Sequence, residues 1–394
     1  MSKGALGLLA AYWPEDTPRY AHVPLKTLGD TTIYPIAAAS PDRVALVSAE
    51  GALTFGELAA KARVFGESIR SRVERGSRVA IAATNPAELL IALFGAFEAD
   101  VLAFPHIGSP PKEVLDAFVP DLVVGENLPE TAASKAAFAE IMSGPGKARS
   151  GRPDFRTPIL AMPSPDGHGE TLHSHRTLVA TGISIGAFYL LAEDITLLLL
   201  EPPTNWCALA MLLGAMNRGA TIYAGWDGSL QHLPGRLDYA VCGWDRAGLL
   251  LDESQAEVLA GRIAAGLIVG IERPFSSSRR LRLGRRIRAD VLTLLGRNDL
   301  GPIVGSHPAW FLNDAAGIPL PSVDLRPLNP TDGAPLNIGW EVVDSAELGV
   351  KSALAPAGGT VVDGWLRSGL IAQIDPTGFY FLLRDSRDSR VRPA

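Results

Sequence analysis

Residues 77–106, SRVAIAATNPAELLIALFGAFEADVLAFPH, predict a strand, a helix and a second strand in direct succession. The apolar runs at 77–84 and 101–106 have the length and composition of buried strands. Between them, residues 86–100 begin with Pro86, which favours the first turn of a helix because no amide partner is needed there. This strand–helix–strand order predicts a parallel sheet with helices covering both of its faces.

A helix start is predicted just upstream, in the stretch TFGEL at residues 54–58. Thr54 and Glu57 have the spacing of a capping box, in which each side chain accepts a hydrogen bond from the other residue's backbone amide. The amphipathic helix that follows is expected to reach Val73, because apolar residues recur on one of its faces. These apolar residues are Leu58, Ala62, Phe65 and Ile69.

Downstream, strands and helices continue to alternate. A strand is expected at 121–126, and residues 127–156 predict a helix plus a surface connection. Further elements are expected at 157–163, 175–191, 195–202, 207–219, 220–225, 237–243 and 266–272. After Ile303 the pattern changes to short β segments separated by proline and glycine. The sequence therefore predicts an α/β unit at 1–156, a second α/β unit at 157–302, a β-rich subdomain at 303–384 and a hinge remnant or tail at 385–394.

The composition narrows the classes of function. The 394 residues are 47% hydrophobic and carry a net charge of -6, so there is no overall basic field for nucleic acid or an anionic membrane. The longest apolar runs, such as 195–200, are too short to span a bilayer, and the first residues give little support to a signal peptide. Cys207 and Cys242 lie in apolar stretches and are expected in the core. A cytoplasmic protein is expected.

Six stretches carry a resemblance to a known family through their order and spacing. They are PDRVALVSAEGALTFGELAAKA (41–62), SPDGHGETLHSHRTLVA (164–180), MLLGAMNRGATIYAG (211–225), LGRNDLGP (295–302), GIPLPSVDLRPLN (317–329) and DGWLRSGLIAQIDPTGFYFLLRD (363–385). Together they resemble the large N-terminal domain of the adenylate-forming superfamily, which includes acyl- and aryl-CoA ligases, luciferases and peptide-synthetase adenylation domains. The resemblance implies an α/β fold of two parallel-type sheets flanked by helices, layered αβαβα, with a small β-rich, barrel-like subdomain.

The resemblance also implies a two-step reaction. ATP and Mg²⁺ activate a small carboxylic acid as acyl-AMP, and a thiol such as CoA then takes the acyl group. The sequence stops at the family's hinge, so the C-terminal lid domain is expected to be absent. A lid acting in trans, a carrier protein and a homodimer are the partners that the resemblance suggests.

Several family positions expected to bind the nucleotide hold other residues here. Gly169 stands at the lysine of the phosphate loop, so a cation that would bind polyphosphate is missing. Leu295 replaces the aromatic residue that stacks on adenine, and Leu370 replaces the aspartate that holds the ribose hydroxyls. An aliphatic side chain at that position accepts no hydrogen bond. These changes predict impaired ATP chemistry.

Other residues at these motifs keep suitable chemistry. Asp299 stands at the family's magnesium-associated glutamate and is both the candidate metal ligand and, with His175 at the helix start, a candidate catalytic residue. Strict spacing puts Ser386 at the ribose-contacting arginine, whereas a one-residue gap puts Arg387 there. The candidate nucleotide-binding residues are Ser164, Gly167, Gly169, Gly296, Asn298 and Arg387.

Three residues are candidates for the substrate pocket. Trp206 lies where relatives place an aromatic residue near the acid, and Trp244 and Asp245 follow a strand that forms another pocket wall in the family. Core packing is the alternative for both tryptophans. Asp245 either orients a substrate or caps the following helix, and the cap is the better supported alternative.

Two clusters allow a second interpretation. His168, Glu170, His173 and His175 could form a zinc site, although their spacing matches no common pattern and His175 already fits the family's helix start. Arginine-rich residues 279–288 are expected to form a solvated helix face, or to dock a polyanion such as the CoA phosphates or an acidic carrier protein.

Two functions are therefore predicted. The first is an AMP-forming, acid-activating ligase-like protein, of the acyl- or aryl-CoA ligase kind, with impaired ATP chemistry on its own. The second is a catalytically silent family member that binds or scaffolds an acyl or aryl acid, or its thioester.

Overall fold

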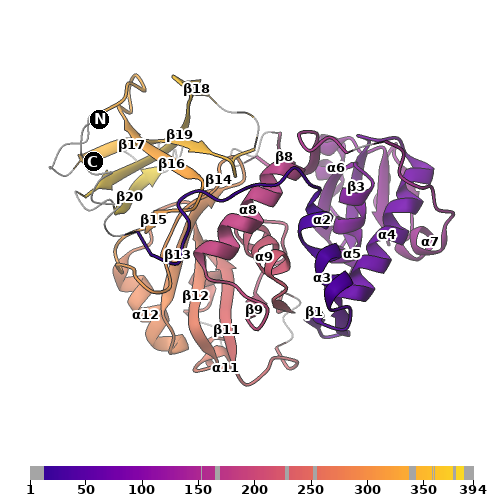
Figure 1. Ribbon diagram of the computed structural model, residues 1–394, viewed down its shortest axis with the longest axis horizontal. Coiled ribbons are helices and arrows are strands. Elements are labelled where there is room, and N and C mark those ends of the chain that lie inside the picture. Colours follow the sequence, from indigo (N-terminus) through magenta and orange to yellow (C-terminus); the bar gives the residue numbers. More distant parts are fainter. Residues whose placement is uncertain are drawn as a thin grey trace.

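The computed structural model describes residues 13–385 except 152, 165–168, 227–229, 252–254, 337–342, 357, 359 and 376–378. Figure 1 shows the chain from its amino-terminal α/β part on one side to a small β-rich part on the other. Three sheets organise these residues.

The first sheet has six strands. In spatial order they are β6 (Ser134–Ala136), β5 (Leu122–Gly125), β3 (Arg78–Ala83), β4 (Leu102–Ile107), β7 (Pro158–Pro163) and β8 (Glu170–Ser174). All neighbours pair in parallel except β7 and β8, which form an antiparallel hairpin. The parallel strand–helix–strand unit predicted at residues 77–106 is confirmed, with α5 (Pro86–Glu98) between β3 and β4.

The second sheet has nine strands. In spatial order they are β15 (Ile318–Pro319), β14 (Gly301–Gly305), β13 (Val291–Arg297), β12 (Ile263–Ile271), β11 (Leu237–Gly243), β9 (Thr196–Leu199), β10 (Thr221–Ala224), β1 (Val44–Ser48) and β2 (Gly51–Thr54). The six strands from β13 to β1 are parallel, and antiparallel strands extend the sheet at both ends.

The third sheet is antiparallel and forms the β-rich part. It contains β16 (Val323–Leu328), β17 (Val343–Ser352), β19 (Trp365–Ile374), β18 (Val361–Val362) and β20 (Tyr380–Asp385). β14 and β15 belong to the second sheet instead, although both lie in or near the predicted β-rich range.

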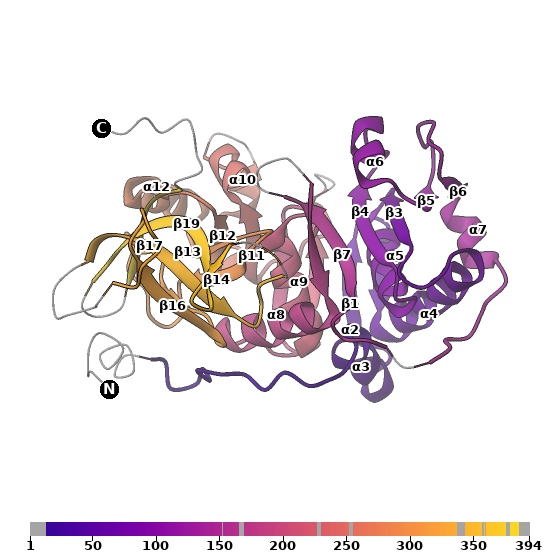
Figure 2. The same ribbon diagram turned by 90° about the horizontal axis from the view of Figure 1, so that it is seen from above.

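Helices separate and cover the two larger sheets. The inner helices are α4 (Phe55–Arg72), α5, α8 (His175–Phe188) and α9 (Trp206–Arg218); α5 packs against strands of both sheets, and α9 packs on the second sheet and on α8 (Figure 2). On the outer face of the first sheet lies α6 (Lys112–Phe118), whose Leu115 and Phe118 cover Ala80 and Phe104. On the outer face of the second sheet lie α10 (Trp244–Leu249) and α12 (Ser277–Ile287). The layered αβαβα fold is thus confirmed.

The short helices complete the structure, and the predicted helix start is confirmed. They are α2 (Leu28–Thr31), α3 (Ile33–Ala39), α7 (Phe138–Ser143) and α11 (Gln255–Leu259). Thr54 and Glu57 form the reciprocal capping box at the start of α4, and Val73 is its C-cap. Residues 127–156 contain the short strand β6 in addition to the expected helix.

Strand pairing crosses the predicted boundary at residue 156 in both directions. The segment at 158–163 joins the first sheet because Leu160 of β7 pairs in parallel with Ala103 of β4. Conversely, β1 pairs in parallel with β10 and so belongs to the second sheet. The two α/β units are therefore interleaved along the chain, and the β7–β8 hairpin belongs to the first sheet.

An extended segment before α2 runs along the molecule from the third sheet to the inner helices (Figure 2). Arg19 is ion-paired with Asp324 at 2.8 Å, and Thr17 Oγ1 lies 3.1 Å from His307 Nε2. None of the helices in the described part of the chain combines the length and apolar character that crossing a membrane requires.

Candidate active site

The β7–β8 hairpin meets the turn between β13 and β14, so two motifs far apart in sequence come together. Asn298 Nδ2 donates a hydrogen bond to the carbonyl oxygen of Pro163 at 2.7 Å. At the loop end of the hairpin, the Ser164 amide donates to the Gly169 carbonyl at 3.2 Å. Three candidate nucleotide-binding residues are thus neighbours: Ser164, Gly169 and Asn298. Gly167 lies outside the described residues.

Gly169 has a backbone that favours glycine. Its φ is +86°, in the left-handed region, and a Cβ placed there would meet no atom within 4 Å. The position therefore has space for a side chain, at the cost of a strained backbone.

Within the hairpin, His173 on β8 is 5% exposed and forms a hydrogen bond with the backbone of Asn298. Burial lowers the pKa of His173 to about 4, so its ring is neutral at pH 7. The uncharged ring cannot replace the missing lysine as a cation for phosphate.

Asp299, the candidate metal ligand, forms an ion pair with Arg297. The Arg297 guanidinium donates from Nε to Asp299 Oδ1 at 2.7 Å and from Nη2 to Oδ2 at 3.2 Å. Arg297 is 2% exposed, and its Nη2 also donates to the Ser368 carbonyl on β19 at 2.6 Å. Because both carboxylate oxygens of Asp299 are engaged, a Mg²⁺ ion would compete with a buried guanidinium for them.

Leu370 lies two residues beyond this contact, on β19. It is fully buried, and its amide donates to Ser368 Oγ at 3.0 Å. The side chain belongs to the main hydrophobic core. Arg387, the other candidate ribose contact, lies outside the described residues.

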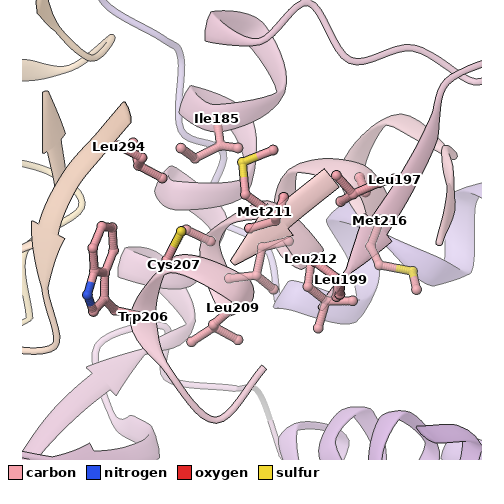
Figure 3. Close-up of a cluster of buried hydrophobic side chains, with 14 of the residues drawn as sticks. Ile185, Leu197, Leu199, Trp206, Cys207, Leu209, Met211, Leu212, Met216 and Leu294 are labelled. Carbon is pink, nitrogen blue, oxygen red and sulfur yellow. The ribbon is translucent and has the colours of Figure 1, made fainter. Parts of the chain in front are cut away.

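Trp206 fills the space at the carboxyl ends of β12 and β13 (Figure 3). Its indole lies so close to Gly270 and Gly296 that a Cβ on these glycines would approach ring atoms to 3.3 Å and 2.7 Å. Its Nε1 donates to Glu272 Oε1 at 2.7 Å, and the residue is 6% exposed. The close approach of this ring therefore requires glycine at position 296. The structure supports the core-packing alternative for Trp206.

Trp244 and Asp245 lie apart from the hairpin, on α10. The Trp244 ring packs edge-on against Phe275 with centroids 4.9 Å apart, and the guanidiniums of Arg273 and Arg279 lie over it. The helix N-cap is Gly243, so Asp245 does not cap the helix as expected. Its carboxylate is 90% exposed and lies 2.9 Å from Arg273. Attraction to the Arg273 guanidinium accounts for the orientation of the Asp245 carboxylate.

A cavity of about 450 Å³ lies beside Trp244. It is lined by aromatic and polar residues that include Trp244, Phe275, Ser277, Arg279, Thr293 and Asp314. It has room for a small organic molecule and offers hydroxyl, cationic and aromatic contacts.

His175 is buried and has a hydrogen-bond partner at each ring nitrogen. Nδ1 accepts from the Leu28 amide at 3.1 Å, so Nε2 carries the proton and faces Asp100 Oδ1 at 3.4 Å. Burial alone would raise the pKa of Asp100, but hydrogen bonds from His175 and Arg149 lower it. These contacts join α8, α2 and the loop before β4. They give His175 a structural role in holding these elements together.

The described members of this cluster, Glu170, His173 and His175, do not converge on one point. Glu170 is held by Arg78 at 2.6 Å, whereas His173 and His175 have the separate partners described above. Among the described residues there is no group of three or more metal-ligating side chains, and His168 lies outside them. The structure therefore gives no support to the zinc alternative.

Comparison with known proteins agrees with this fold. Residues 35–117 match the model of the AMP-binding enzyme family. The ATP-bound structure of MatB from Rhodopseudomonas palustris is similar with a TM-score of 0.74 at 15% identity, over 91% of this chain and 79% of that one. No curated protein sequence matches the chain.

Two further solved structures show the same likeness. The N-terminal subdomain of NpsA from Klebsiella oxytoca, in complex with 3-hydroxyanthranilyl-AMSN, has a TM-score of 0.76 at 18% identity, over 92% of this chain and 99% of that one. The o-succinylbenzoate CoA synthetase MenE from Bacillus subtilis has a TM-score of 0.74 at 17% identity, over 89% and 77%. These likenesses show the fold, and the match of residues 35–117 to the AMP-binding enzyme model agrees with the predicted resemblance to the large N-terminal domain of the adenylate-forming superfamily.

Proposed function

We propose that the chain is an AMP-forming, acid-activating ligase-like protein whose ATP chemistry is impaired when it acts alone. The observation that carries this proposal is the engagement of both oxygens of Asp299 by buried Arg297, next to a hairpin with no lysine at Gly169. The group expected to hold a divalent cation and the group expected to hold the triphosphate are thus both weakened.

The described residues fit a magnesium nucleotide poorly. Adenylating catalysis depends on positioning the reactants and on stabilising negative charge on phosphoryl oxygens. Removing one such donor typically costs about a hundredfold in rate or more, so two weakened groups are expected to cost several powers of ten. ATP-bound MatB shows that the fold accommodates ATP in that relative. For this chain, ATP, Mg²⁺ and CoA remain proposals, as do a trans-acting lid, a carrier-protein partner, a homodimer and a cytoplasmic location.

The test is carboxylate-dependent ATP–pyrophosphate exchange by the full-length chain over a broad panel of fatty and aromatic acids. We expect exchange at or near the level without enzyme for every acid. Robust exchange with any one acid would overturn the proposed impairment.

A second candidate function is a catalytically silent module that binds an acyl or aryl acid, or its thioester. It is favoured by the cavity beside Trp244, where aromatic rings and Arg279 could hold an aromatic or anionic ligand. Thermal stabilisation by an acid or its CoA ester, without stabilisation by magnesium–ATP, would support this function. A Trp244→Ala variant should lose that stabilisation.

A further inference from the structure

Helix α12 separates its arginines into one buried side chain and several exposed ones. Arg280, Leu283 and Ile287 form the buried stripe, at the i, i+3 and i+7 spacing of one helix face. Arg279, Arg282 and Arg285 face solvent, and Arg288 follows at the C-cap with a φ of +56°. The helix itself contains no acidic residue.

The buried arginine is bound by neutral groups. Arg280 Nε donates to the Val291 carbonyl at 2.5 Å, and Nη2 donates to Ser306 Oγ at 3.0 Å. Its Nη1 faces three backbone carbonyls, those of Leu312, Asn313 and Ala315. Burial lowers the pKa of Arg280 to about 10, which leaves it charged at pH 7. Its positive charge is thus fixed in place without a directly bonded carboxylate.

The positive charges of the exposed arginines are also not neutralised by carboxylates within the described part of the chain. No ion pair is found there for Arg282, Arg285 or Arg288. Like charges three or four residues apart on a helix repel each other and destabilise it. An anion bound between them would relieve this repulsion.

A cavity of about 490 Å³ lies against this surface. Its charged lining residues are Arg280, Arg285, Arg288 and the single carboxylate Asp290. Apolar side chains from the amino end of β12 and from α12, including Ile263 and Leu281, complete it. The volume suits a small organic molecule, and three guanidiniums against one carboxylate leave the cavity positive.

We propose that this cavity, which we call the α12 groove, binds a phosphorylated small molecule. Arg285 and Arg288 are exposed, and a guanidinium matches two phosphate oxygens with parallel N–H donors. Arg280, whose donors bind neutral groups, adds a fixed positive charge at the wall. A hollow of about 490 Å³ suits a small phosphate ester, whereas an acidic protein would contact the exposed face of α12. The groove lies at the amino ends of β12 and β13, and the hairpin site lies at the carboxyl end of β13. The inference therefore stands whether or not the proposed function does.

The test is calorimetric titration of the full-length chain with inorganic pyrophosphate, without metal, and with CoA and 3′-dephospho-CoA. We expect saturable binding that weakens about tenfold or more in an Arg285→Glu variant and further in Arg285→Glu/Arg288→Asn, since charged hydrogen bonds contribute about 1.5–3 kcal/mol. Asparagine is chosen at 288 because it tolerates the left-handed backbone. An exposed arginine elsewhere, changed in Arg156→Glu, is the matched control and should bind as the wild type does.

Each outcome decides a specific point. Weaker binding of dephospho-CoA than of CoA identifies the 3′-phosphate as the group bound, and equal binding identifies the diphosphate. Affinity unchanged in both α12 variants, or lost in Asn298→Ala instead, would place the anion elsewhere and overturn the inference. Absence of binding by all three probes, together with capture of an acidic protein through the exposed face, would also overturn it.

Discussion

Gly169 is the residue at which a gain of function can be tested. Its surroundings are open, so the obstacle to a side chain is the left-handed backbone alone. A Gly169→Lys variant restores a cation at the hairpin, and a charged hydrogen bond to phosphate contributes about 1.5–3 kcal/mol. We expect magnesium–ATP to bind roughly tenfold more tightly by calorimetry.

The control for this variant is Gly151→Lys. Gly151 has a φ of +82° and equally open surroundings, so the backbone strain is matched. If both lysine variants bind ATP as weakly as the wild type, the missing loop cation is not what limits binding.

Trp206 occupies space that a smaller side chain would leave empty. We expect Trp206→Ala to lower the free energy of unfolding by about 3–5 kcal/mol, as large-to-small core changes do. The resulting cavity between Gly270 and Gly296 should bind indole, whose N–H can donate to Glu272, so indole should raise the Tm of this variant. Exposed Trp310, changed to alanine, is the control. Equal effects of indole in both variants would show that Trp206 does not fill a ligand-sized space.

His173 makes stability depend on pH. Its folded pKa is about 4, below the ordinary value of 6.5, so the unfolded chain binds more protons between these values. Stability is therefore fully present above pH 6.5 and is lost as pH falls, by roughly 1.4 kcal/mol per pH unit until about pH 4. Urea unfolding at pH 7 and pH 5 should show a smaller loss for His173→Gln than for the wild type.

His307 contributes in the same direction, because burial lowers its pKa as well. The His173→Gln variant should therefore retain part of the pH dependence. An identical loss in wild type and variant would show that His173 is not protonated on unfolding.

At the scale of elements, Arg297 joins the end of β13 to β19 of the third sheet. Arg297→Ala removes the guanidinium contacts to Asp299 and to the Ser368 carbonyl, and breaking such a buried pair costs about 3–5 kcal/mol. Chemical unfolding should show this loss, with a smaller loss for Asp299→Asn because Asp299 is partly exposed. A loss below about 1 kcal/mol for Arg297→Ala would mean that the two sheets are held together by other contacts.

The elements also show where sequence patterns were sufficient. The capping box of α4 and the strand–helix–strand unit from β3 to β4 were predictable, because local spacing alone determines them. The assignment of β1 and β7 to opposite sheets was not, since both read as short apolar strands and only long-range pairing separates them.

In the candidate site, the motif positions predicted which residues lie near one another, namely the hairpin and the turn with Asn298. The partners of these residues could not be read from the sequence. Arg297 next to Asp299 is visible as a pair of charges, but its burial and its contact with Ser368 depend on the position of β19. The same holds for Glu272, which binds the Trp206 indole across 66 positions.

At the scale of the whole molecule, the proposed function is that of an adenylating scaffold whose hold on ATP is weakened. The most direct measurement is calorimetric titration with magnesium–ATP of the Arg285→Glu/Arg288→Asn variant, in which the α12 groove no longer competes for phosphate. The proposed impairment of ATP binding predicts a Kd of about 1 mM or weaker, which corresponds to a binding free energy of only about -4 kcal/mol. A micromolar Kd would contradict it, because such binding requires the nucleotide contacts that Gly169, Asp299 and Leu370 are proposed not to make.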